Sequence, residues 1–140
     1  MSRKFNATVY NTVSSRVYVE VTHNTKYKFN GKPKTYLKFI ERARTEFVRE
    51  LGIDQTILKD EAGLVFAVRR VEADYLGSAK LDDELIVETE VANVTGVRLL
   101  MEQRVKRGEE LLFHAMVTVV CMNDAGQPVR LPANIRQMVH

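Results

Sequence analysis

The side chains best suited to acid–base chemistry are His23 and Glu41. An unperturbed imidazole titrates at about pH 6.5, so His23 in the segment EVTHN could act as a general base at neutral pH. It could equally be an ordinary histidine at a turn or strand end. Glu41 lies in IERARTE, where its carboxylate could accept a proton. Lys38 and Arg44 are each three residues from Glu41, however, and an ion pair along one helix face also explains this glutamate.

The other polar candidates are expected to be structural. Asp82 and Asp83 in LDDEL have the setting of solvated acids in a turn, and His114 in LLFHAMV that of a strand residue with a satisfied hydrogen bond. Cys121 is the only cysteine, so an internal disulfide is excluded, and its apolar surroundings indicate a core position. No His, Cys and Asp spacing resembles a zinc site, and no glycine pattern resembles a phosphate-binding loop. We therefore expect neither a metal nor a bound cofactor.

One segment with a clear helical period must position Glu41. It runs from Tyr36 to Leu51, with Thr35 as a candidate N-cap and Gly52 as a C-terminal stop. The predicted apolar face consists of Tyr36, Leu37, Ile40, Ala43, Phe47 and Leu51.

Most of the remaining chain alternates with a period of two, which is typical of strands. Such runs are RVYVEV (16–21), LIVETEV (85–91), VRLLMEQRV (97–105) and LLFHAMVTVVC (111–121). The last is apolar on both faces, as expected of a central strand. Closely spaced strands pair antiparallel, so one helix against one antiparallel sheet predicts an α+β fold. The length and the absence of linkers predict a single domain over residues 1–140.

The lysine-rich segment before the helix predicts a small hairpin. Asn30-Gly31 is a strong hairpin signal within TKYKFNGKPKTY, so residues 25–36 are expected to turn there with the lysines facing water. Five lysines beside Tyr27 and Phe29 could also contact single-stranded nucleic acid. Acidic and basic residues are interspersed elsewhere, so nucleic-acid binding is not predicted.

The composition is that of an ordinary globular protein. The chain has 45% hydrophobic residues and a formal net charge of +3. The N-terminal sequence lacks the apolar run of a signal peptide, and no stretch is long enough to span a membrane. We expect a cytoplasmic location.

Three blocks together resemble a known family. YLKFIERARTEFVRELG (36–52), VFAVRRVEADYLGSAKLDDELIVETEV (65–91) and VVCMNDAGQPVRLP (119–132) are similar to hotdog-fold acyl-CoA thioesterases of the 4-hydroxybenzoyl-CoA thioesterase superfamily, in its Tol-Pal-associated branch. The resemblance implies a long helix wrapped by a curved antiparallel sheet, assembled as a homodimer or homotetramer. It also implies hydrolysis of acyl-CoA by water, with coenzyme A as part of the substrate. Coenzyme A phosphates would then be held by Arg69, Arg70 and Arg130, which lie in matched blocks.

The chain departs from this family in the segment before the helix. The family follows its first strand with Glu-Asp-Thr-Asp, then glycines, then a Tyr-His pair, and the second aspartate acts as nucleophile or general base. Here Glu20-Val21-Thr22-His23 stands in that place, so His23 replaces the aspartate. Residues 21–35 therefore resemble a replaced loop, as in an engineered protein. The departure leaves three hypotheses: a thioesterase with weakened activity, a catalytically silent scaffold that presents a hairpin, or an acyl-CoA binder without turnover.

Overall fold

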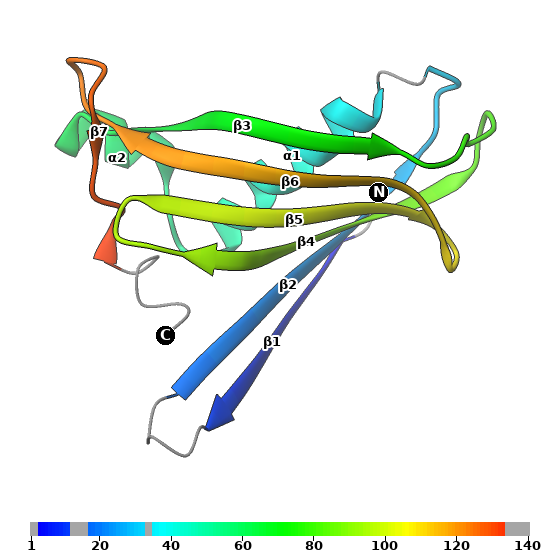
Figure 1. The fold of residues 1–140 in the computed structure, drawn as a ribbon, viewed down its shortest axis with the longest axis horizontal. Coiled ribbons are helices and arrows are strands. Elements are labelled where there is room, and N and C mark those ends of the chain that lie inside the picture. Colours follow the sequence, from blue (N-terminus) through cyan, green and yellow to red (C-terminus); the bar gives the residue numbers. More distant parts are fainter. Residues whose placement is uncertain (1–2, 12–16, 33–34, 134–140) are drawn as a thin grey trace.

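The alternating segments form one antiparallel sheet, and the longer helix lies against one face of it. The structure is a computed structural model that describes residues 3–11, 17–32 and 35–133, with side chains described from Asn24 onward (Figure 1). In chain order the elements are β1 (Arg3–Asn11), β2 (Val17–Lys28), α1 (Thr35–Glu50), α2 (Gln55–Ala62), β3 (Val65–Tyr75), β4 (Glu84–Val94), β5 (Arg98–Arg107), β6 (Glu110–Met122) and β7 (Pro128–Val129).

The sheet is built around three consecutive strands. Its order is β1-β2-β4-β5-β6-β3, with β7 paired to β6, and every pairing is antiparallel. β2 joins β4 at one side and β3 joins β6 at the other, so the two strands that flank the helices in sequence lie on opposite sides of the β4–β5–β6 meander. Figure 1 shows α1 behind the β4–β5–β6 meander, and β1 with β2 extending away from this meander. The α+β prediction is confirmed.

α1 turns one apolar face to the sheet, as its sequence period predicts. Leu37 is an exception, because it is 43% exposed. It follows the buried Tyr36 directly, and one residue rotates a helix by about 100°. The helix ends where expected: Gly52 has φ +84° and its N–H donates to the carbonyl oxygen of Arg49 at 2.9 Å. The buried residues of α1 are Thr35, Tyr36, Phe39, Ile40, Ala43, Phe47 and Val48.

The core lies between α1 and the helix-facing side of the sheet. The alternation predicted for β4, β5 and β6 is confirmed, and β6 has a strand on each side, as its two-sided apolar sequence predicts. Val97, the first residue of the run predicted as a strand over 97–105, is 44% exposed because it precedes the first residue of β5. Fully buried sheet residues include Leu85, Val87, Leu99, Met101, Val105, Phe113, Ala115 and Val117.

A second helix, α2, was not expected from the sequence. Asp54 caps it, because its Oδ1 accepts from the N–H groups of Thr56 at 2.9 Å and Ile57 at 3.1 Å. Gly63 ends it with φ +66°. Among the described residues no helix is both long and apolar enough to cross a membrane.

The hairpin predicted for residues 25–36 is wrong. β2 continues to Lys28 and pairs with β4 from Thr22↔Glu90 to Lys28↔Glu84. Residues 25–28 therefore find their partner in a strand distant in sequence, and Thr35 already belongs to α1. Four of the five lysines are exposed as expected, at positions 26, 28, 32 and 38, while Lys34 lies outside the described residues.

Asn30-Gly31 instead makes the bend between β2 and α1. Asn30 Oδ1 accepts from the N–H of Lys32 at 3.0 Å and from the hydroxyl of Thr35 at 2.7 Å. Gly31 has φ +83°, a conformation that favours glycine. The turn signal was real, but it joins a strand to a helix.

Candidate active site

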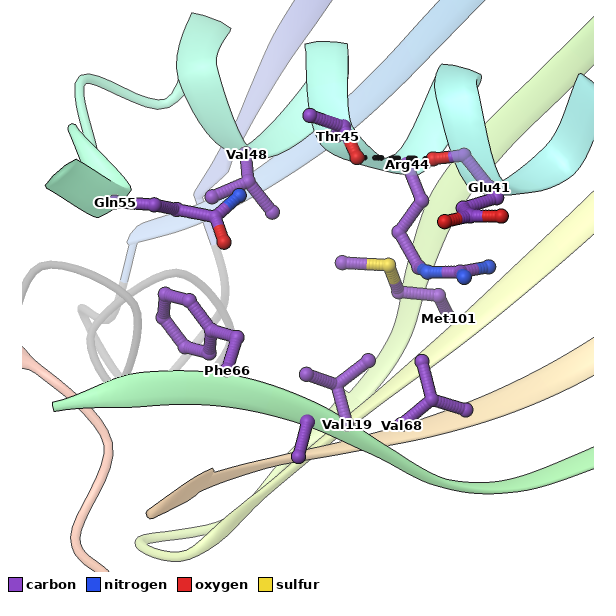
Figure 2. Close-up of a pocket in the computed structure, with 10 residues that line it drawn as sticks. Glu41, Arg44, Thr45, Val48, Gln55, Phe66, Val68, Met101 and Val119 are labelled. Carbon is purple, nitrogen blue, oxygen red and sulfur yellow. Dashed lines mark hydrogen bonds between the residues drawn. The ribbon is translucent and has the colours of Figure 1, made fainter. Parts of the chain in front are cut away.

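A hollow of about 170 Å³ lies between α1 and β3. Its walls combine the polar side of α1 with apolar side chains from three strands (Figure 2). The lining residues are Glu41, Arg44, Thr45, Val48, Gln55, Phe66, Ala67, Val68, Met101 and Val119. This mixture of apolar walls and a few polar groups is typical of a small-molecule site.

Glu41 and Arg44 supply the charged groups of this hollow. Glu41 is exposed, whereas Arg44 is half-buried, and Figure 2 shows both side chains on the hollow side of α1. Burial lowers the pKa of the Arg44 guanidinium, and the negative charge of Glu41 acts in the opposite direction. The charge of Glu41 thus acts on Arg44, but the ion pair expected along this helix face stays a prediction. The hydrogen bond of the guanidinium goes elsewhere, to Gln103.

Gln103 is a completely buried polar side chain on the helix-facing side of β5. Its Oε1 accepts from Arg44 Nη1 at 2.9 Å. Its Nε2 donates to the backbone oxygen of Ile40 at 2.8 Å and to the hydroxyl of Thr89 at 3.0 Å. Gln103 was not among the residues selected from the sequence. The available signal was a polar residue at a position where the β5 alternation predicts an apolar one.

A second hollow, of about 450 Å³, lies at the start of α1. It is bordered by Phe29, Gly31, Tyr36 and residues 75–79. The Tyr36 ring contacts those of Phe29, Tyr75 and Phe113, with centroid separations of 5.6, 6.1 and 5.5 Å. This end of the molecule thus has an aromatic wall, and Tyr75 in it is 55% exposed.

His23 is described through its backbone. It lies in β2, opposite Phe5 of β1 and Thr89 of β4. Its strand neighbour Thr89 contacts Gln103, which in turn contacts Arg44. The structure therefore places His23 one strand away from the polar network that reaches the hollow, and its role stays a prediction.

The three arginines expected to hold phosphates are exposed, two of them side by side in β3 and one beyond β7. Arg69 falls at the irregularity in the β3–β6 register between Val68 and Arg70. Arg70 pairs with Glu72 at 2.6 Å. Arg130 follows β7, and its guanidinium lies near Gly96. Arg69 and Arg70 are close in β3 to the wall of the hollow, whereas Arg130 lies after β7 and does not line the hollow.

His114 and Cys121 have the structural surroundings that were expected, whereas Asp83, expected to be a solvated acid, is half-buried and forms an ion pair with Arg107. Asp83 Oδ2 accepts from the N–H of Lys80 and from Arg107 Nη1, both at 2.7 Å. These two hydrogen bonds lower the pKa of its carboxyl group. His114 Nε2 shares a 2.6 Å hydrogen bond with Glu102. Cys121 is buried, and burial raises the pKa of its thiol.

The side of the sheet away from α1 carries a network of charged groups. Arg104 contacts Glu88 at 2.9 Å, Glu90 at 3.1 Å and Glu102 at 2.7 Å. Lys106 also contacts Glu88, at 3.1 Å. Burial alone would lower the pKa of Arg104, but the three carboxylates outweigh it and raise this pKa. Within the described residues no cluster of His, Cys, Asp and Glu could hold a metal ion.

Comparison with known sequences assigns the chain to a protein family. A family model described as Thioesterase superfamily matches residues 35–114, more than half of the chain. The chain belongs to the thioesterase superfamily. Within it, the chain is 42% identical over 127 residues to "Acyl-CoA thioesterase YbgC" of Haemophilus influenzae, covering 89% of this chain and 90% of that protein. It is 36% identical over 122 residues to "Acyl-CoA thioester hydrolase YbgC" of Escherichia coli O6:H1, covering 86% and 88%.

Structural comparison agrees with this assignment to the thioesterase superfamily. A probable thioesterase from Bartonella henselae superimposes with a TM-score of 0.72 and 32% identity, covering 79% of this chain and 99% of that one. The hotdog fold implied by the sequence blocks is therefore confirmed. In this fold α1 and β3 form the two sides of the hollow that contains Glu41 and Arg44.

Proposed function

We propose that this thioesterase-superfamily protein hydrolyses acyl-CoA thioesters in the hollow between α1 and β3. The observation that carries the proposal is the placement of the Glu41 carboxylate on a hollow with apolar walls, beside the half-buried cation of Arg44. Apolar walls suit an acyl group, and a carboxylate suits the activation of water. The acyl-CoA activity named for the relatives at 42% and 36% identity supports the same substrate class.

The proposed reaction uses water and protein side chains, with coenzyme A entering as part of the substrate. A base, Glu41 or His23, takes a proton from water while the water oxygen attacks the thioester carbonyl carbon. The tetrahedral intermediate then collapses, the C–S bond breaks, and the thiolate of coenzyme A takes up a proton. The products are a free carboxylic acid and coenzyme A.

We expect the rate to be low. The family's catalytic aspartate and glycines have no counterpart here, and residues 22–28 form regular strand paired with β4. Residues 22–25 pair with both β1 and β4, so their backbone groups are held in the ladder and are not available to approach a thioester. The same observation favours the alternative of an acyl-CoA binder without turnover.

We propose that Arg69 and Arg70 hold coenzyme A phosphates, because both lie in β3 next to the hollow wall formed by Phe66, Ala67 and Val68. Arg130 is a third candidate from a matched block. A cytoplasmic location remains a prediction from the sequence.

A homo-oligomer is also part of the proposal. β3 is the outermost strand at its end of the sheet. Exposed apolar side chains lie along this strand and directly after it. They are Val65, Val68, Val71, Tyr75 and Leu76, each more than 40% exposed. An exposed apolar edge is a template for pairing with another chain.

Hydrolysis assays over several acyl-chain lengths test the proposal. The wild type should release coenzyme A slowly, and Glu41→Gln should reduce kcat at least about ten-fold if Glu41 is the base. Glu61→Gln on α2 is the matched control, since Glu61 is exposed and does not line this hollow. His23→Ala tests the second candidate base in the same hydrolysis assay. Absence of hydrolysis together with measurable acyl-CoA binding would support the binder, and absence of both would contradict the proposal.

A further inference from the structure

We propose that one end of the molecule, formed by the bend before α1 and the connection between β3 and β4, docks on a lipid bilayer that carries anionic headgroups. This inference goes beyond the proposed function and does not depend on it. It gives a role to the lysine-rich segment before α1, which hydrolysis leaves without one. The docking surface consists of Lys28, Lys32, Leu37, Lys38, Lys80 and Leu81, none of which belongs to β3.

The two segments of this surface are distant in sequence but joined in the structure, and Figure 1 shows them at the same end of the molecule. The N–H of Phe29 donates to the carbonyl oxygen of Asp83 at 2.8 Å, and the N–H of Asp82 donates to that of Phe29 at 2.9 Å. Leu81 also reaches the bend, because its Cδ1 lies 3.6 Å from the position that a Cβ of Gly31 would take. The bend and Leu81 therefore share one surface.

An ordered turn holds Leu81 at the surface. Leu81 is 67% exposed, more than any other large apolar side chain in the described part of the chain. The N–H of Asp83 donates to the carbonyl oxygen of Lys80 at 3.0 Å, and Asp83 Oδ2 accepts from the N–H of Lys80 and from Arg107 Nη1. Leu37, 43% exposed, adds a second aliphatic side chain in the first turn of α1. Exposed apolar side chains rimmed by charged ones are typical of a contact surface.

The basic side chains of this surface are exposed and form no salt bridge within the described residues. They are Lys28, Lys32, Lys38 and Lys80. Several acids nearby already have a partner: Arg107 pairs with Asp83 at 2.7 Å and Glu110 at 2.8 Å, and Lys26 pairs with Glu84 at 3.4 Å. Asp82 and Glu109 remain as exposed acids without a salt bridge in the described part of the chain. The four lysines thus leave an excess of positive charge.

The side chains beside the lysines decide which polyanion fits. A single-stranded nucleic acid is held by exposed aromatic rings on which its bases stack. The two aromatic residues among the lysines are not available for stacking, because Tyr27 is 5% and Phe29 is 3% exposed, and the Tyr27 ring already stacks on Phe39 at 4.7 Å. The exposed neighbours are the aliphatic Leu37 and Leu81. Aliphatic side chains with lysines match acyl chains with anionic headgroups, which is the chemistry of a bilayer surface.

Co-sedimentation with lipid vesicles tests the proposal. The wild type should bind vesicles of phosphatidylcholine with about 30% phosphatidylglycerol, and should bind pure phosphatidylcholine vesicles at least about ten-fold more weakly. Leu81→Ser should weaken binding to the anionic vesicles about ten-fold, because the leucine no longer enters the acyl region. Lys28→Gln combined with Lys32→Gln should weaken it by about ten-fold or more, and added salt should weaken it further in the wild type.

Two control variants match these changes at other exposed positions. Ile57→Ser removes an apolar side chain of α2 that is 51% exposed, and Lys59→Gln combined with Arg98→Gln removes the same net charge as the lysine variant. Both controls should bind anionic vesicles as the wild type does. Circular dichroism checks that each variant is folded, and Leu37→Ser replaces Leu81→Ser if the latter is not.

Three results would overturn the proposal. The first is a wild type that does not bind the anionic vesicles or binds both vesicle types equally. The second is undiminished binding by folded Leu81→Ser and Leu37→Ser, because the lysines would then hold any polyanion without insertion into lipid. The third is a control variant that loses as much binding as the variant it matches.

Discussion

The hydroxyl of Tyr36 accepts a hydrogen bond from the backbone N–H of Ala79 at 3.0 Å. This contact joins the first turn of α1 to the loop between β3 and β4, across one wall of the aromatic hollow. Burial raises the pKa of the Tyr36 hydroxyl above that of an ordinary tyrosine.

Tyr36→Phe should lower the free energy of unfolding by about 1 kcal/mol, because the Ala79 N–H loses its partner in a half-buried position. Chemical denaturation measures the change. Tyr75→Phe is the control: the Tyr75 ring is in the same aromatic cluster, but the residue is 55% exposed. Equal stability of Tyr36→Phe and wild type would show that water replaces the contact.

Gly31→Val should destabilise the bend between β2 and α1. A valine at φ +83° is strained, and forcing an L-residue into this region costs about 1–2 kcal/mol. Gly31→Asn should cost less, because asparagine adopts this conformation more readily. Thermal unfolding of the two variants checks the order. If the valine variant were as stable as the asparagine variant, the positive φ of Gly31 would be contradicted.

Asp54→Ala should lower stability by about 1 kcal/mol, since two N–H groups at the start of α2 lose their acceptor. Asp54→Asn keeps a side-chain oxygen and should restore most of the loss. Hydrogen exchange should localise the effect to residues 55–62, and a uniform change across the chain would argue against a capping role.

Acid should destabilise the protein partly through Glu102. Its hydrogen bond to His114 and the charge of Arg104 lower the pKa of Glu102 in the folded state. Such a carboxyl contributes stability that is fully present above its unfolded pKa of about 4.3 and is lost as the pH falls through the folded pKa. Glu102→Gln should therefore be less stable than the wild type at pH 7, and its stability should fall less steeply below about pH 4.3.

Glu84→Gln is the control for this titration. Glu84 pairs with Lys26 at 3.4 Å, but both side chains are about half exposed or more, at 67% and 49%. Exposed pairs contribute little. If the stability of Glu102→Gln varied with pH in parallel with that of the wild type, the contribution assigned to the Glu102 carboxyl group would be contradicted.

Val71→Lys should convert an oligomer into a monomer of 16.0 kDa in light scattering. A lysine on the outermost strand opposes edge pairing. Val97→Lys is the control, because Val97 has similar exposure, 44% against 42%, but lies at the β4–β5 connection. A wild type that is monomeric would contradict the proposed assembly.

The elements that the sequence predicts well are those whose pattern is local and complete. α1 has a full apolar face and a glycine stop, and the meander strands alternate regularly. α2 was missed because none of its residues is buried, so it has no apolar period to detect. Its signals were the capping Asp54 and the terminal Gly63.

The hairpin error arose because the partner of a strand is not encoded locally. Asn30-Gly31 bends the chain, but the next element is a helix, and residues 22–28 pair with β4 instead. The candidate site shows the same limit. Glu41 could be selected by its residue type, whereas Gln103 acquires meaning only when β5 is placed beneath α1.

The sheet order also has a consequence for how the chain folds. β4, β5 and β6 are joined by short turns, such as the one closed by Thr95 N–H to Arg98 O at 2.9 Å. β2 and β3 attach to the two sides of this meander through partners far away in the sequence. Closing those long loops costs entropy before the contacts form, so the meander is the part of the molecule that can assemble first. Formation of the Glu41 hollow, which needs both α1 and β3, is then a late event in folding.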